Sequence, residues 1–186
     1  LKNRDRIYAL IKDVTIGRNP SDDPSAIMSE SFGRAGVPHS TVQLIEASGS
    51  AIRKTEEREI ECINRIWGEH KPGGPLVGLG SISGNIGNTL RASMSAGLVK
   101  TAYALWHRVL PPQVEVSSVA DNLSTPSSSA YLLLEPRPWI LGDMSNPRRA
   151  AVTGSNFDAV NPIGGSTEQG GRSAVIVLEE EPEDRQ

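Results

Sequence analysis

The chain has 186 residues, of which 37% are hydrophobic and 22% are charged, a balance typical of one folded domain and not of a disordered or collagen-like chain. Its formal net charge of -3 favours neither nucleic acid nor an anionic membrane as a partner, and no apolar run reaches the ~18 residues of a membrane span. A single cysteine cannot form an internal disulfide, so we expect a reducing compartment, the cytoplasm.

Strand and helix patterns alternate along most of the chain. In chain order we expect a strand over 6–17, a helix over 25–37, a strand over 40–48, a helix over 55–70, a strand over 75–82, a helix over 91–108, and late strands at 130–136, 148–154 and 172–180. Strands that alternate with helices and then follow one another predict a layered α/β fold with a mixed sheet.

The helix expected over 91–108 is apolar around most of its circumference. Its polar stripe, formed by Ser93, Lys100 and Arg108, is narrow. A helix that is apolar all round is typical of a protein interior. We therefore expect this helix to be buried between layers, with its N-terminus pointing toward the glycine-rich turn that precedes it.

The turn "GSISGNIGNT", at 80–89, joins the end of a strand to this helix. Gly78, Gly80 and Gly84 do not have the spacing of a dinucleotide fingerprint, and no acidic residue follows about 20 residues later at the end of a second strand. The pattern of a phosphate-binding loop is also missing. A nucleotide site is therefore an alternative that the sequence does not favour.

The same turn resembles the Gly-Ser-x-Lys-Ser-Asn-Ile-Gly-His motif of β-ketoacyl synthases, the condensing enzymes of fatty-acid and polyketide assembly. Four further stretches match that family in order and spacing, from about Arg6 to Glu180: "IEASGSAIRKTEEREIE", "EPRPWI", "NPRRAAVTGSN" and "SAVIVLEE". The resemblance covers the C-terminal half of a synthase. It implies a thiolase-like fold in which a mixed sheet lies between helical layers, and it assigns the nucleophilic cysteine to the other half.

The resemblance also identifies the positions that perform chemistry in the family. Two histidine positions are occupied by Ser48 and Asn88, and the lysine position by Ser83. Serine without a base and asparagine cannot carry a proton between groups. The residues that shape the turns remain, namely Gly49, Gly84, Asn85 and Gly87. This pattern predicts a scaffold that has lost catalysis, with Asn88 close to Ser48 at the floor of a shallow pocket.

Other features complete the prediction. We expect a ketosynthase-like half-domain over 1–178 and an acidic tail or linker over 179–186. The loop over 154–171 does not align with the glycine-rich loop of the family. Arg148 and Arg149 are candidates to contact an acidic carrier protein, although surface pairing is the favoured interpretation. Cys62 lies on a helix among apolar residues and is expected to pack in the core. No cofactor is expected, and no pattern indicates a metal site.

Three functions remain open at this stage. The favoured one is a non-catalytic partner in a polyketide or fatty-acid synthase, comparable with a chain-length factor. Such a partner would pair with its own N-terminal half or with an active ketosynthase, as a homo- or heterodimer, and could meet an acyl carrier protein. The second is an active acyltransferase whose cysteine lies in a missing N-terminal half. The third is an unrelated small-molecule or nucleotide-binding module.

Overall fold

The computed structural model describes residues 5–18, 22–68, 76–89, 91–116, 118–142, 145–154 and 173–182. Six strands form a mixed sheet in the order β1-β8-β7-β2-β3-β5. The four strands β7, β2, β3 and β5 are parallel to one another, whereas β8 runs antiparallel to both β1 and β7. Their bounds are Leu10–Ile16, Leu44–Glu46, Val77–Gly80, Ala130–Leu132, Arg149–Gly154 and Ala174–Glu179 for β1, β2, β3, β5, β7 and β8.

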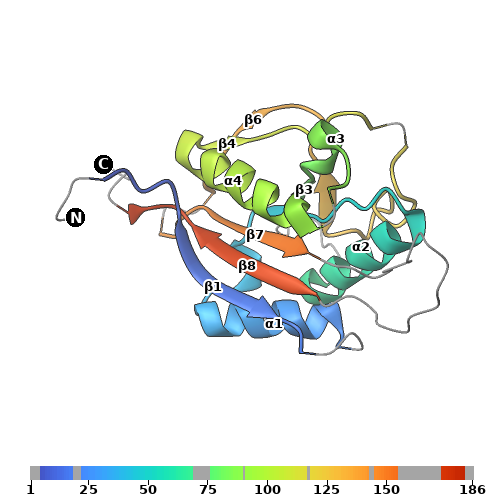
Figure 1. Cartoon of the computed structure of the whole chain (residues 1–186), viewed down its shortest axis with the longest axis horizontal. Coiled ribbons are helices and arrows are strands. Elements are labelled where there is room, and N and C mark those ends of the chain that lie inside the picture. Colours follow the sequence, from blue (N-terminus) through green and yellow to red (C-terminus); the bar gives the residue numbers. More distant parts are fainter. Residues whose placement is uncertain are drawn as a thin grey trace.

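The helices cover both faces of this sheet (Figure 1). They are α1 (Pro24–Ala35), α2 (Arg53–Trp67), the short α3 (Ser83–Ile86) and α4 (Arg91–His107), with one 3-10 turn, η1 (His39–Thr41). Two small strands not expected from the sequence, β4 (Val109–Leu110) and β6 (Arg137–Pro138), pair with each other beside the end of α4. The predicted mixed sheet between helical layers is confirmed.

Local sequence explains where α1 begins and ends. The carboxylate of Asp23 accepts a hydrogen bond from the backbone N–H of Ser25 at 3.0 Å, and Pro24 occupies the first turn, where its missing N–H costs nothing. Gly36 ends the helix with φ of 63°, a left-handed conformation that glycine adopts without strain.

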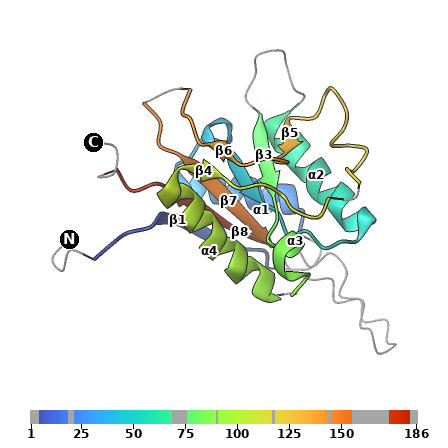
Figure 2. The same cartoon turned by 90° about the horizontal axis from the view of Figure 1, so that it is seen from above.

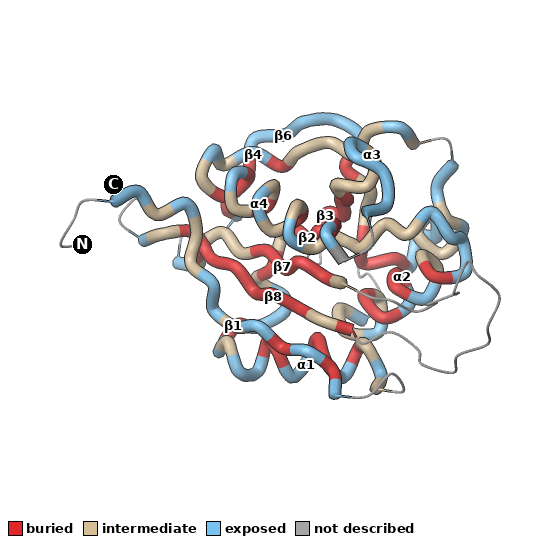
Figure 3. Tube along the Cα trace, in the orientation of Figure 1, coloured by how far each residue is buried: buried red, intermediate tan, exposed pale blue. Residues whose placement is uncertain are grey.

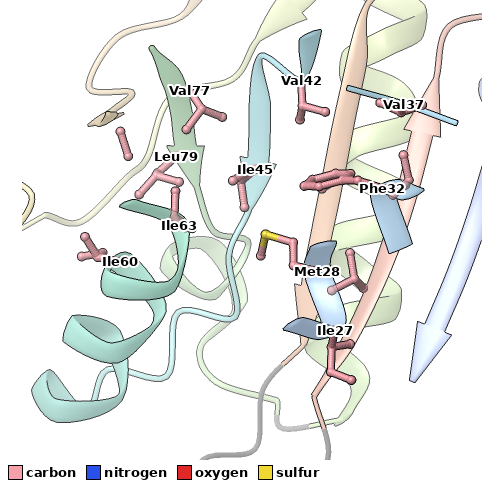
Figure 4. Packing of buried hydrophobic residues seen from close by; sticks show 14 residues of the cluster. Ile27, Met28, Phe32, Val37, Val42, Ile45, Ile60, Ile63, Val77 and Leu79 are labelled. Atoms are coloured by element: carbon pink, nitrogen blue, oxygen red, sulfur yellow. The ribbon is translucent and has the colours of Figure 1, made fainter. Parts of the chain in front are cut away.

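Buried hydrophobic residues form two clusters, one on each face of the sheet. The first joins α1 and α2 to the sheet, and Figure 4 shows Phe32 and Met28 of α1 lying near Ile45 of β2. The second lies under α4 and contains Leu105, Trp139 and Leu178. In Figure 3 the buried residues follow the central strands, so the core is a layer on either side of β2, β7 and β8.

The orientation of α4 corrects one expectation. The helix is not buried all round within this chain: Ser93 and Thr101 are buried on the side of the sheet, whereas Val99 is 56% exposed and Tyr103 is 48% exposed. The polar side chains therefore face inward and several apolar ones face outward. The reason is a buried carboxylate on the sheet, described below, that pairs with Lys100 of this helix.

The C-terminal boundary also differs from the prediction. Glu179 is the last residue of β8 and Glu180 is 3% exposed, so neither belongs to a solvated tail. Their carboxylates pair with Arg149 at 2.7 Å and Arg148 at 2.8 Å, and these ion pairs keep both residues in the folded domain. The predicted boundary after residue 178 is therefore too early by at least two residues.

Among the described residues, no helix combines the length and the apolar character that crossing a bilayer requires.

The orientation of α4 leads to a stability prediction. We expect Leu105→Ala to lower the free energy of unfolding by about 2–5 kcal/mol, because Leu105 is 1% exposed and its truncation leaves a cavity. Val99→Ala on the opposite face should change it by about 0.5 kcal/mol or less. Urea denaturation of the two variants of this chain measures both values. Equal losses would contradict the orientation.

Candidate functional site

The site lies where β2 and β3 end. These strands are parallel neighbours, so their carboxyl ends meet at one edge of the sheet. In open α/β sheets this edge is where ligand sites form. Ser48 follows β2 by two residues, Ser83 is the first residue of α3 after β3, and Asn88 follows α3. The topology alone therefore brings the three predicted positions toward one another.

Hydrogen bonds connect these positions directly. The hydroxyl of Ser83 donates to the backbone carbonyl of Ser48 at 3.1 Å. The amide of Asn88 donates to the backbone carbonyl of Ser50, also at 3.1 Å. Asn88 thus contacts the segment that contains Ser48, through a hydrogen bond to the residue two positions further along. All three side chains serve here as parts of a hydrogen-bonded turn.

Glu59 of α2 fixes the position of Ser48 by hydrogen bonds. Its carboxylate accepts the backbone N–H of Ser48 at 3.0 Å, the hydroxyl of Ser48 at 2.8 Å and the hydroxyl of Thr153 at 2.6 Å. Burial raises the pKa of Glu59, against the opposing effect of these three donors. The hydroxyl of Ser48 is therefore directed to an interior carboxyl group. The sequence had matched Glu59 to the family pattern without revealing this role.

A second buried acid, Glu46, lies at the end of β2 and is 1% exposed. Its carboxylate pairs with the ammonium of Lys100 on α4 at 2.8 Å and accepts the backbone N–H of Ile82 in the turn. Burial raises the pKa of Glu46, and the positive charge of Lys100 opposes that shift. This residue joins a strand, a helix and the turn, and sequence analysis missed that function because its partners are distant along the chain.

Two glycines of the turn are explained by different constraints. A Cβ at Gly84 would lie 2.6 Å from the carbonyl oxygen of Val114, so a side chain has no room there. Gly87 has open space around it, but its φ of 74° is strained for any residue with a side chain. Steric crowding therefore requires glycine at position 84, whereas backbone conformation requires it at position 87. Asn85 lies within α3 and Gly49 has φ of 53°.

A cavity of about 770 Å³ borders the site and is lined in part by Gly49, Ser83 and Asn88. It is larger than the shallow pocket that the sequence suggested. Ser48 is not among the described residues that line it, since its hydroxyl bonds to Glu59. Of the three positions that the resemblance assigns to catalysis, two therefore line the cavity: Ser83 with its hydroxyl and Asn88 with its amide. Neither group transfers protons at neutral pH.

Arg148 and Arg149, the two candidate carrier contacts, form ion pairs within the chain. Arg148 donates to Glu180 and to the carbonyl of Trp139, and Arg149 donates to Glu179 and to Thr41. The side chains of Arg148 and Arg149 are only 14% and 12% exposed. This agrees with the pairing that the sequence favoured, and a carrier contact at these arginines stays a prediction.

The other candidates from the sequence are a cysteine, a metal site and two segments near the C-terminus. Cys62 is buried on α2, and burial raises the pKa of its thiol, as fits a packing residue. The described residues contain no group of three or more His, Cys, Asp and Glu side chains placed to hold a metal ion. Residues 155–171 of the unaligned loop lie outside the described residues, as do residues 183–186, the second half of the predicted acidic tail.

Comparison with known proteins identifies the fold class first. The ketosynthase from module 6 of the bacillaene synthase of Bacillus subtilis 168 superimposes with a TM-score of 0.80 at 22% identity, covering 97% of this chain and 32% of that one. A ketosynthase domain of Streptomyces albus JA3453, OzmH KS7, gives 0.76 at 23% identity, covering 95% of this chain and 30% of that one. The fold is that of ketosynthases, which is thiolase-like.

Sequence comparison then identifies the family. Residues 12–117 match the model of the Beta-ketoacyl synthase, C-terminal domain. The spectinabilin polyketide synthase system protein NorA of Streptomyces orinoci is 31% identical over 160 residues, 84% of this chain and 8% of that protein. Polyketide synthase GfsB of Streptomyces halstedii is 28% identical over 158 residues, 81% of this chain.

The chain therefore belongs to the β-ketoacyl synthase family and corresponds to its C-terminal domain, as found in polyketide synthases. It spans only 3% of the length of GfsB and 8% of NorA, so it matches one part of much larger proteins. The alternative of an unrelated nucleotide-binding module is wrong.

The geometry of the turn predicts how two substitutions differ. Gly87→Val should destabilise the chain several times more than Asn88→Ala, because valine is strained at a φ of 74° whereas the second change removes one exposed amide and its hydrogen bond. Denaturant midpoints for the two variants measure this. A larger loss for Asn88→Ala would show that the amide, and not the backbone, maintains the turn.

The buried acid at Ser48 predicts a pH dependence. A folded-state pKa above the ordinary glutamate value of 4.5 means that Glu59 contributes stability at acid pH, which is lost as the pH rises through the folded pKa. Glu59→Gln cannot ionise, yet its amide oxygen can still accept the N–H of Ser48. We therefore expect the free energy of unfolding of Glu59→Gln, relative to that of the wild type, to increase as the pH rises above about 4.5.

Thermal melts across pH 4–8 measure this difference. Glu61→Gln removes one carboxylate from the exposed side of the same helix and controls for the change in net charge. A melting-temperature difference, Glu59→Gln minus wild type, that stays constant or falls toward neutral pH would contradict the raised pKa.

Proposed function

We propose that this chain is the C-terminal half of a ketosynthase-like domain that has no condensing activity and serves as a structural partner, in the manner of a chain-length factor. One observation carries the proposal: Ser48, Ser83 and Asn88 occupy the family's catalytic positions, lie together at one turn, and have their side chains engaged in hydrogen bonds to the protein's own backbone or to Glu59.

The chemistry of condensation explains why this arrangement argues against activity. Forming a carbon-carbon bond from a decarboxylating thioester requires a nucleophilic thiolate and groups that stabilise the enolate or the thioester oxygen. A serine hydroxyl directed at a buried carboxyl and an exposed asparagine amide supply neither a thiolate nor a titrating imidazole. Cys62 cannot substitute, because it is buried in α2 and burial raises the pKa of its thiol.

The exposed side of α4 supports the structural role. Val99 and Tyr103 are exposed on a helix whose other face is buried, and Val14 and Ile16 of the edge strand β1 are 48% and 59% exposed. Large apolar side chains left open to solvent in this way are typical of a surface that a partner covers. We propose that the N-terminal half of the same synthase, or an active ketosynthase, covers this side of the molecule in the cytoplasm.

An activity assay tests the proposal. The full-length polypeptide, supplied with acyl and malonyl carrier thioesters, should form no condensation product above a protein-free control. In the 186-residue chain by itself, replacing Asn88 and Ser48 together by histidine should also give no product, because its single cysteine, Cys62, is buried and supplies no nucleophilic thiolate. Product formed by the unchanged protein would contradict the proposal and favour an active acyltransferase whose cysteine lies in the other half.

A further inference from the structure

The cavity next to the site is bounded by elements of this chain alone. It lies between α2, β3, β5 and the described residues of the segment 113–123, which are 113–116 and 118–123; these pass α3 and then run beside α2 (Figure 2). The amide of Asn122 fastens that segment by donating to the carbonyl of Glu57 at 2.8 Å. The volume of about 770 Å³ is within the range of small-molecule sites in proteins.

The interior of the cavity is aliphatic. Ile60 of α2, Leu79 of β3 and Leu132 of β5 form its inner wall. The segment 113–123 adds Val116 and Val119 on the opposite side, and Val119 is 39% exposed. Aliphatic walls without aromatic rings suit a flexible hydrocarbon chain better than a flat ring system.

The rim of the cavity is acidic. Four of the described lining residues are acidic, namely Glu56, Glu59, Glu115 and Asp121, and one is basic, Arg53; of the acids, Glu59 is buried. Arg53 is paired with Asp121 at 2.6 Å and with Glu57 at 2.9 Å, so Glu56 and Glu115 are the lining carboxylates at the rim that have no ion pair with it. The remaining field at the mouth is negative, which raises the local concentration of cations and repels anions.

We propose that this cavity binds small amphiphilic cations, with an aliphatic chain between α2 and the segment 113–123 and an ammonium group among the rim carboxylates. Binding is non-covalent and requires none of the residues at the family's catalytic positions to react. The inference is independent of the proposed structural role, because an inactive and an active domain would carry the same cavity.

Three ligands with one tail test the proposal on the full-length polypeptide: octylammonium, octanoate and 1-octanol, titrated by calorimetry at low salt. We expect octylammonium to bind roughly tenfold more tightly than octanoate, with octanol between them. Equal affinities, tighter binding of octanoate, or no binding of octylammonium up to about 1 mM would overturn the proposal.

Matched variants assign the binding to this cavity. Val119→Trp narrows the cavity from its exposed wall and should weaken octylammonium at least about tenfold, whereas Val109→Trp, at a similarly exposed site on β4, should not. If Val119→Trp does not fold, Glu115→Gln serves instead: it should weaken octylammonium and leave octanol unchanged, with the exposed Glu135→Gln as its control. Unchanged octylammonium binding in the folded cavity variant would place the site elsewhere.

Discussion

The buried ion pair between Glu46 and Lys100 is the contact on which the arrangement of the site depends. It joins the end of β2 to the middle of α4, and the same carboxylate accepts the N–H of Ile82 at the start of the turn. Apart from each other, Glu46 Oε2 and Lys100 Nζ have no polar partner among the described residues, so each charge depends on the other. A buried charge that loses its partner is costly, whereas the pair itself adds little net stability.

The surrounding backbone leaves room for this pair. A Cβ at Gly97 of α4 would lie 2.9 Å from Cγ of Glu46, so the helix can approach the strand only with glycine there. Helix, strand and turn are joined by this contact and by the bonds from Glu59 to Ser48, and both acids lie outside the three positions that the resemblance assigns to catalysis. The proposed loss of catalytic side chains is therefore compatible with retention of the fold.

Much of the fold could be predicted from the sequence, since periodicity placed five of the six sheet strands and all three long helices close to their observed bounds and the glycine turn was located correctly. The β2 strand is shorter than expected because η1 occupies the start of its segment. What could not be predicted depends on contacts between distant residues. The inward polar face of α4 follows from Glu46, which is 54 residues before Lys100 and lies on another element.

The same limit applies to the site. The three replaced positions were identified from a motif, but their bonding was not, because Ser48 depends on Glu59 and Thr153. The acidic C-terminal stretch was predicted to be a linker for a similar reason. Glu179 and Glu180 belong to the folded domain because they form ion pairs with Arg149 and Arg148, which lie about 30 residues earlier in the chain. From local composition alone a charged residue is predicted to be solvated, because its partner in the fold is distant along the chain.

The most direct test is a double-mutant cycle on Glu46 and Lys100, with Glu46→Gln and Lys100→Met measured by denaturant unfolding near neutral pH. Lys100→Met should cost about 3–5 kcal/mol, because it leaves a buried carboxylate alone, and the double variant should cost at least about 1 kcal/mol less than the sum of the single ones. Losses that add to within about 0.5 kcal/mol would show that the two residues act independently and that the site is held together by something else.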